Sequence, residues 1–235
     1  NRKSHIIMKR SDIIFLLVFV GLFIPFFLSH RLYDSFLWFS REWAFTASFI
    51  KFAILATMGE MLGSRIKGGV YIPKNFGLIP RAMVWGFLGM TVKAAFVIFS
   101  GGVPIIAGHL GMEDTAAVMA GGVTAPKVLL SFCISFFLNI FYAPVLMVTH
   151  RVTDTHIAAS RGEASGLFRM PDVTAIMAAI DWNSMWGFVL KKTIPFFWIP
   201  AQTVTFLLPP EFQILFAAIL STVLGVILAF SARSR

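Results

Sequence analysis

Five polar or charged side chains fall inside otherwise apolar stretches of the sequence, and they are the residues best able to bind a solute. They are Glu60, Lys93, Asn139, Lys191 and Gln202. An isolated charge at the centre of a bilayer costs on the order of 3 kcal/mol, so each charged group should face protein or water. Together the five would form a polar path with more positive than negative charge, which favours small anions or phosphorylated metabolites. In the alternative interpretation, Asn139 and Gln202 only hydrogen-bond neighbouring helices, with each bond contributing about 1 kcal/mol.

The stretch from Lys191 to Pro210 carries most of the unusual residues. At helical spacing one face of it collects, in order, Lys191, Pro195, Trp198, Gln202, Phe206 and Pro209. Prolines at 195 and 200 remove backbone donors and crowd the preceding turn. We therefore expect a kink or a break in the helix between Lys191 and Gln202.

Glu60 and Lys191 lie at comparable depth near the inner ends of their segments, which predicts an ion pair between them. Lys93 and Gln202 would then form part of the wall of the same cavity. The competing interpretation is snorkelling, because Lys51, Lys93 and Lys192 are near enough to an interface for their long side chains to reach headgroups.

The composition excludes a soluble domain. The chain of 235 residues is 57% hydrophobic, 15% aromatic and only 13% charged, which predicts one integral membrane domain over residues 1–235. Its first apolar segment is longer than the hydrophobic region of a signal peptide and should be retained. The single cysteine, Cys133, cannot form an internal disulfide and is expected to be a small buried hydrophobe.

Six apolar segments of about 18 to 25 residues predict an all-α polytopic transmembrane bundle. They lie near 12–29, 43–64, 82–100, 127–149, 185–208 and 212–231. Most flanking Lys and Arg residues fall on one side of this topology, and only Arg31, Arg41 and Lys127 fall on the other. The positive-inside rule then places both termini on the cytoplasmic or matrix side. The formal charge of +9 reflects this topology, so we expect membrane lipid as a partner and no nucleic acid, and the oligomeric state stays open.

Two connections and several small residues complete the expected architecture. The Gly-rich segment 101–126 predicts either a flexible loop or a short interfacial or re-entrant helix near 113–119. Residues 172–182 predict an amphipathic helix on the inner surface, starting at Asp172. Small residues recur at helical spacing and predict close helix packing; they are Ala56, Gly59 and Gly63, then Gly86 and Gly89, then Ala218, Ser221, Gly225 and Ala229.

Trp198, Gln202, Phe206 and Pro210 form a W-x3-Q-x3-F-x3-P pattern. This pattern resembles the signature of the Mpv-seventeen and 22-kilodalton peroxisomal membrane protein family (the Mpv/PMP family). Weaker similarities occur in the same order at Gly59 with Glu60, at Arg81 with Gly89, and at Tyr142 to Pro144, so that residues 50–231 are covered. The chain departs from the family where Ile199 separates Trp198 from Pro200, where Thr205 replaces Asn, where Ile214 replaces Arg and where Ser64 replaces Gln. It therefore resembles a divergent, bacterial-type member.

The resemblance implies a small membrane protein associated with solute-conducting pores, without an agreed substrate. It also implies a bacterial cytoplasmic membrane or, in a eukaryote, the mitochondrial inner or peroxisomal membrane. Together with the polar path, it predicts a channel or transporter for small, anionic solutes. A non-conducting scaffold or lipid-binding protein is the alternative.

An enzyme is the less favoured class. No nucleophile elbow, P-loop, HExxH or CxxC pattern occurs in the sequence. His150, Asp154 and His156 share one inner segment, but their spacing fits no familiar metal site. We therefore expect neither a catalytic residue nor a metal or other cofactor.

Overall fold

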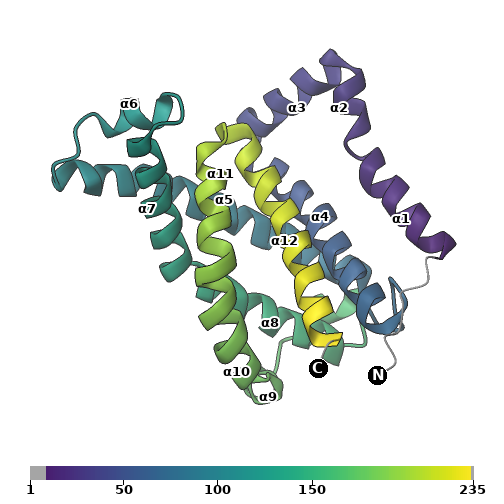
Figure 1. Ribbon diagram of the computed structural model, residues 1–235. Helices are drawn as coiled ribbons and strands as arrows, with labels where there is room; N and C mark the ends of the chain where they lie inside the picture. Colours follow the sequence, from purple (N-terminus) through teal and green to yellow (C-terminus); the bar gives the residue numbers. More distant parts are fainter. Residues whose placement is uncertain (1–8, 234–235) are drawn as a thin grey trace.

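The computed structural model describes residues 9–233, and in this range the chain forms helices joined by loops, with no strand. The predicted all-α class is confirmed. The helices are α1 (Arg10–Gly21), α2 (Ile24–Leu28), α3 (His30–Glu42), α4 (Ala44–Gly68), α5 (Leu78–His109), α6 (Thr115–Ala120), α7 (Ala125–Phe141), α8 (Ala143–Ala159), η1 (Ala164–Phe168), α9 (Val173–Ala179), α10 (Trp182–Ser184), η2 (Met185–Trp198), α11 (Ile199–Leu207) and α12 (Pro210–Arg233). Figure 1 shows α4, α5, α7, α11 and α12 as the central bundle, with α8 and α9 at its lower end and α1–α3 as an arm on the right.

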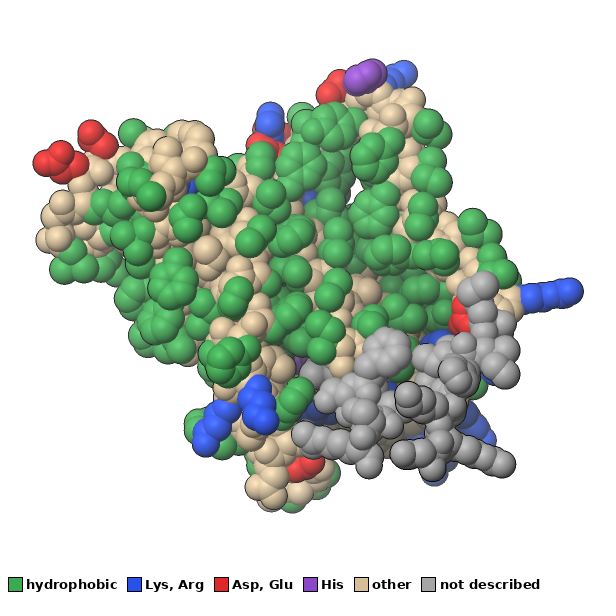
Figure 2. All heavy atoms as spheres, in the orientation of Figure 1, with side chains coloured by type: hydrophobic (Ala, Val, Ile, Leu, Met, Phe, Trp, Pro, Cys, Tyr) green, Lys and Arg blue, Asp and Glu red, His purple; other side chains and the backbone are tan. Residues whose placement is uncertain are grey.

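Three helices of the described chain are long and apolar enough to cross a membrane: α4, α5 and α12 over Pro210–Ile227. Two further spans are counted if bent pairs are each taken as one, namely α7 with α8, bent by 43°, and α9 with the helix over Trp182–Leu207, bent by 67°. Figure 2 shows hydrophobic side chains over the middle of one face, with most charged side chains toward its edges. The chain thus has three to five candidate spans, consistent with an integral membrane protein.

The six predicted spans are not confirmed, because the segment 12–29 is not one helix. It divides into α1 of 12 residues and α2 of 5 residues, with a turn between them. Pro25 stands in the first turn of α2, where its missing N–H costs no helical hydrogen bond. The side chain of Ser29 then accepts a hydrogen bond from the Leu32 N–H and starts α3.

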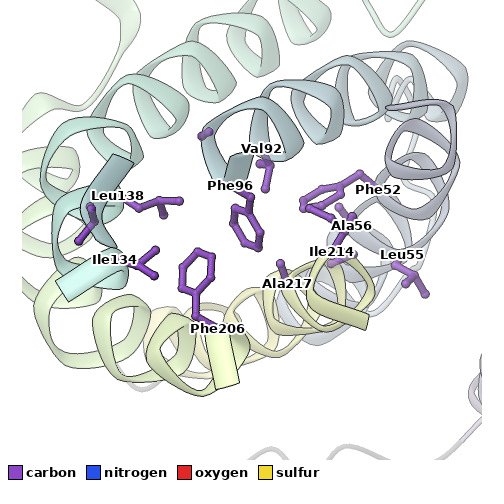
Figure 3. Packing of buried hydrophobic residues seen from close by; sticks show 13 residues of the cluster. Phe52, Leu55, Ala56, Val92, Phe96, Ile134, Leu138, Phe206, Ile214 and Ala217 are labelled. Carbon is purple, nitrogen blue, oxygen red and sulfur yellow. The ribbon is translucent and has the colours of Figure 1, made fainter. Parts of the chain in front are cut away.

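The hydrophobic core lies where α4, α5, α7, α11 and α12 meet. Phe96 of α5 and Phe206 of α11 point toward one another at its centre, with 4.8 Å between ring centroids (Figure 3). The surrounding buried residues are Phe52, Leu55, Ala56, Val92, Ala95, Val103, Ile134, Leu138, Ile214, Ala217 and Ala218. Cys133 packs against this cluster as a free cysteine and is only partly buried.

Small residues let these helices approach closely, as their spacing predicts. A Cβ atom added to Gly59 of α4 would lie 2.8 Å from the Cα of Thr222 in α12, and Gly225 lies against the Gly59 carbonyl. On the other side of α4, a Cβ at Gly89 would lie 2.7 Å from the Ser48 carbonyl oxygen. The side chain of Ala229 lies outside the described side chains. Helix α4 is therefore held between α5 and α12 at backbone contact.

Helix α5 is longer than the predicted segment 82–100, because it runs on through Gly101 and Gly102 to His109. It absorbs the first part of the expected Gly-rich connection. The short helix expected near 113–119 is present as α6. Lys127 follows at the start of α7, where its buried ammonium donates to the Gly121 carbonyl at 2.6 Å.

The sequence predicts a kink or a break between Lys191 and Gln202; the structure has no break there and shows a change of winding. The chain remains helical from Trp182 to Leu207, with wide π-type turns over Met185–Trp198 and α-helical turns from Ile199 onward. Pro195 lies in the wide part, and Pro200 lies in the first turn of α11. Proline therefore coincides with irregular winding here, without interrupting the helix.

The expected amphipathic helix begins as predicted but ends early. The Asp172 carboxylate accepts a hydrogen bond from the Ala175 N–H at 3.0 Å and caps α9, which ends at Ala179. Ile176 and Ile180 are buried, whereas Val173 is 55% exposed. Only part of the predicted apolar face is thus covered by the rest of the chain.

One end of the bundle collects basic residues and is called the basic end below; it is defined by Lys67, Lys74, Arg81 and Arg151. There the loop before α5 meets the loop after α8, since Gly77 and Gly162, both at positive φ, lie in contact. A side chain at either glycine would collide with the facing backbone. This close contact brings the end of α4, the start of α5 and the end of α8 together.

The arm α1–α3 is tied to the basic end through Asp12. Its carboxylate accepts two hydrogen bonds from the Arg65 guanidinium, both at 2.7 Å, and one from the Tyr71 hydroxyl at 2.9 Å. The Arg65 hydrogen bonds, helped by the Lys9 N–H, hold the pKa of Asp12 well below its usual range. Burial and the Asp12 hydrogen bond raise the pKa of Tyr71 to about 12.

The docking of α1 should therefore persist over a wide pH range. The depressed pKa of Asp12 stabilises the folded state above about pH 4, and this contribution is lost only as the pH falls through the lowered value. The raised pKa of Tyr71 also stabilises the folded state below about pH 10, and this stabilisation is lost as the pH rises toward 12.

Asp12→Asn should make α1 amides exchange several-fold faster with deuterium at pH 6, whereas Asp34→Asn on α3 should not. Equal protection in both variants would contradict this role of Asp12.

Candidate functional site

A cavity of about 470 Å³ opens at the basic end and extends into the bundle. It is large enough for a small organic ligand, since such pockets measure about 300 to 1,000 Å³. Its walls come from α4, α5, α7, α8, η2, α11 and α12. The charged lining residues are Glu60, Lys67, Lys74, Arg81, Arg151 and Asp154, and the uncharged polar ones include Ser64, Asn75, Asn139, His150, Gln202 and Ser221.

Glu60 of α4 is the centre of a polar network in the cavity wall. Its carboxylate accepts a hydrogen bond from the Trp85 indole N–H at 2.7 Å and a second one from the Arg81 guanidinium. The His150 Nε2 lies 3.2 Å from the same carboxylate and packs edge-on against Trp85, with ring centroids 4.2 Å apart. Residues of α4, α5 and α8 are thus fixed around one carboxylate.

Arg81 joins that carboxylate to a second one. Its guanidinium forms ion pairs with both Glu60 and Asp154, and its Nε donates to the Phe76 carbonyl at 2.6 Å. The guanidinium also lies over the Phe76 ring, 4.8 Å from the centroid. Arg151 approaches Asp154 at 3.8 Å. With its side chain 15% exposed, Arg81 is a partly buried link between two anions.

Deeper in the cavity, the polar groups are fewer and less well satisfied. Asn139, only 1% exposed, donates to the Ser135 carbonyl of its own helix at 2.9 Å. Gln202 and Trp198 are 5% and 7% exposed, and the Gln202 Oε1 and the Trp198 Nε1 have no hydrogen-bond partner among the described residues. The remaining wall is largely apolar, with Phe52, Val92, Phe96, Leu138, Met185 and Leu224.

The structure brings together three of the five predicted site residues, because Glu60, Asn139 and Gln202 all line the cavity. Lys93 and Lys191 do not. Lys93 lies half-buried on another face of α5, and Lys191 is exposed, with its ammonium over the Trp186 ring at 5.9 Å.

The predicted ion pair between Glu60 and Lys191 is therefore wrong. The two residues have similar depth, but depth along a helix does not fix the direction in which a side chain points. Arg81 takes the place predicted for Lys191, since the first turn of α5 lies beside Glu60. Lys51, for which snorkelling was the competing interpretation, donates to the Ser40 hydroxyl at 2.8 Å and lies over the Phe36 ring.

Sequence reasoning missed four members of this network: Arg81, Trp85, His150 and Asp154. A usable signal existed, because Arg81 and Trp85 are four residues apart on α5, and His150 and Asp154 are four residues apart on α8. Such pairs share one helix face. These two polar faces lie at the same end of the bundle as Glu60, so they could have been predicted to contact it.

The histidines and acids of α8 do not converge on one point. His150 faces Glu60, whereas the His156 Nε2 lies 2.9 Å from the Gly166 carbonyl. In the described part of the chain, no group of three His, Cys, Asp or Glu side chains could hold a metal ion.

Three residues of the W-x3-Q-x3-F-x3-P pattern point inward, whereas Pro210 is exposed. Trp198 and Gln202 line the cavity, Phe206 is 1% exposed in the core, and Pro210 begins α12. The fold and the site together define a helical protein with three to five candidate membrane spans and a cavity whose mouth is lined by polar residues. Comparisons with protein-family models, curated proteins and solved structures find no match to this chain.

Proposed function

We propose that this protein binds a small anionic solute in the cavity and passes it across a membrane. The supporting observation is the convergence of charged and polar side chains from several helices on one cavity, with four cationic residues against two acidic ones. A cavity lined by an excess of one charge concentrates ions of the opposite charge. Anions should therefore enter from the basic end.

The cavity favours a carrier over a permanently open pore. Beyond its apolar wall lie Phe206, Ile134 and Val103, which are at most 4% exposed and do not line the cavity. Passage to the other side requires these packed residues to move. Binding and passage need no covalent chemistry, so we do not propose an enzyme.

We further propose that the chain is a divergent member of the Mpv/PMP family. The inward position of Trp198, Gln202 and Phe206 supports this, since the pattern then follows a face engaged in the core and the cavity. In this proposal the basic end faces the cytoplasm or matrix, by the positive-inside rule. The membrane would be bacterial, or mitochondrial inner or peroxisomal in a eukaryote.

Flux in proteoliposomes tests the proposed function. With a panel of anions, sugars and nucleotides, we expect anions to move fastest. Gln202→Leu should lower anion flux by about tenfold, since the lost hydrogen bond to a desolvated solute contributes roughly 1.4 kcal/mol. Lys93→Ala and Lys191→Gln should leave the flux nearly unchanged, because both lysines lie outside the cavity.

Two outcomes would contradict the proposal. An equal loss of flux in Lys93→Ala and Gln202→Leu would show that the solute does not pass through the cavity, because only Gln202 lines it. Solute binding without any flux would favour the alternative of a non-conducting lipid-binding protein, which the apolar part of the cavity wall also suits.

A further inference from the structure

We propose that the occupant of the cavity is an amphipathic anion, with a carboxylate or phosphate head on an apolar chain or ring. This inference rests on the proposed function and narrows its substrate class. It follows from the uneven distribution of polar and apolar groups between the mouth of the cavity and its depth.

The depth of the cavity suits an apolar body. The residues there are mainly aromatic and aliphatic, and include Phe52, Val92, Phe96 and Leu138. A small hydrophilic ion in this region would lose its hydration and gain few hydrogen bonds in return. An apolar chain instead gains free energy for each methylene removed from water.

The mouth of the cavity suits an anionic head. Arg81 is already neutralised by Glu60 and Asp154, so it has little charge left to offer a ligand. Lys67 and Lys74 are exposed at the rim and have no ion pair among the described residues. These two ammonium groups are the cations best placed to meet a carboxylate or phosphate entering from solution or from the headgroup region.

Deeper than the mouth lie a donor and an acceptor that have no hydrogen-bond partner within the described part of the chain. The Trp198 Nε1 and the Gln202 Oε1 are buried, one turn apart, on the cavity wall. A buried polar group without a partner is costly, and a ligand lowers this cost only where one of its polar atoms reaches this level. A headgroup-sized anion held at Lys67 and Lys74 would leave this part of the cavity empty.

Binding rather than flux is the appropriate measurement, because protonated short-chain acids cross bilayers without a protein. Isothermal titration of the protein in phosphatidylcholine nanodiscs, with empty nanodiscs subtracted, would compare octanoate, acetate, inorganic phosphate and octylammonium. Octanoate should bind at least tenfold more tightly than the other three. The combined change Lys67→Gln with Lys74→Gln should weaken octanoate several-fold, and Lys191→Gln should not.

A steric pair of variants locates the binding. Leu146 lines the cavity, and its neighbour Val145 is 60% exposed on the outside of α8. Leu146→Trp should abolish octanoate binding, and Val145→Trp should preserve it. Mass spectrometry of co-purified lipid in the same two variants separates the sources: an anionic lipid lost only from Leu146→Trp identifies a lipid occupant, and no difference identifies a free acid.

The inference and the proposed function can fail separately. If acetate, phosphate or octylammonium binds as tightly as octanoate, the proposal of an amphipathic anion as the occupant is wrong. The proposal that the protein transports a small solute can still hold in that case. Unchanged octanoate binding in Leu146→Trp also overturns the inference. If no anion binds and none moves in proteoliposomes, the proposed function fails with it.

Discussion

Replacing Arg81 with methionine should destabilise the folded protein by about 3 kcal/mol, the lower limit of the range of about 3 to 5 kcal/mol found when one partner of a buried ion pair is removed, because Arg81 and its partners are only partly buried. Arg81 is the only guanidinium in contact with both Glu60 and Asp154 among the described residues. Its loss leaves two carboxylates facing the same cavity. The Trp85 N–H and His150 remain beside Glu60, so the loss should fall toward the lower end of this range.

A double variant distinguishes a charge effect from a packing effect. Adding Glu60→Gln to Arg81→Met removes the uncompensated charge next to Trp85, while Asp154 keeps Arg151 nearby. The double variant should therefore be more stable than Arg81→Met alone. Reversible unfolding in mixed micelles, followed by tryptophan fluorescence, gives the free energies.

The matched control is Arg169→Met, at a pair with Glu163 in which both side chains are more than half exposed. Exposed ion pairs contribute at most about 1 kcal/mol. A similar loss in both Arg→Met variants, or a double variant weaker than Arg81→Met, would show that the network does not behave as a buried charge cluster.

Helix positions were the most predictable part of this fold. The segments 43–64 and 212–231 correspond closely to α4 and α12, because long apolar stretches are visible locally in the sequence. The division of segment 12–29 and the bend at Tyr142 were not visible. Each depends on how a few backbone groups are satisfied near a proline and a neighbouring helix, which hydropathy does not report.

Several residues of the candidate site could be predicted from the sequence, but the contacts between them could not. Glu60, Asn139 and Gln202 were expected in one polar cavity because polar groups avoid lipid, and they lie there. The partner of Glu60 was missed because Arg81 was counted as a flanking topology charge. A residue at the end of one helix can still reach into the bundle when the next helix is tilted across it, and this tilt is a tertiary property.

Gly59→Val should destabilise the protein by about 3 kcal/mol, near the upper end of the usual cost of overpacking. The Cβ of any residue at this position meets the Cα of Thr222 at 2.8 Å, which no choice of rotamer relieves. Helices α4 and α12 must therefore move apart. The hydrogen bond of the Thr222 hydroxyl to the Leu55 carbonyl, 2.8 Å long, would be lost with this movement.

The control is Gly101→Val, because Gly101 lies within α5 and a Cβ there meets nothing within 4 Å. Its effect should stay within about 0.5 kcal/mol, since valine is a better helix former than glycine.

A second test uses Thr222→Ala, which shortens the side chain and leaves the Cα in place. This change should not rescue Gly59→Val, because the collision is with the backbone. A full rescue would mean that α4 and α12 meet through side chains, and the close approach described here would be wrong.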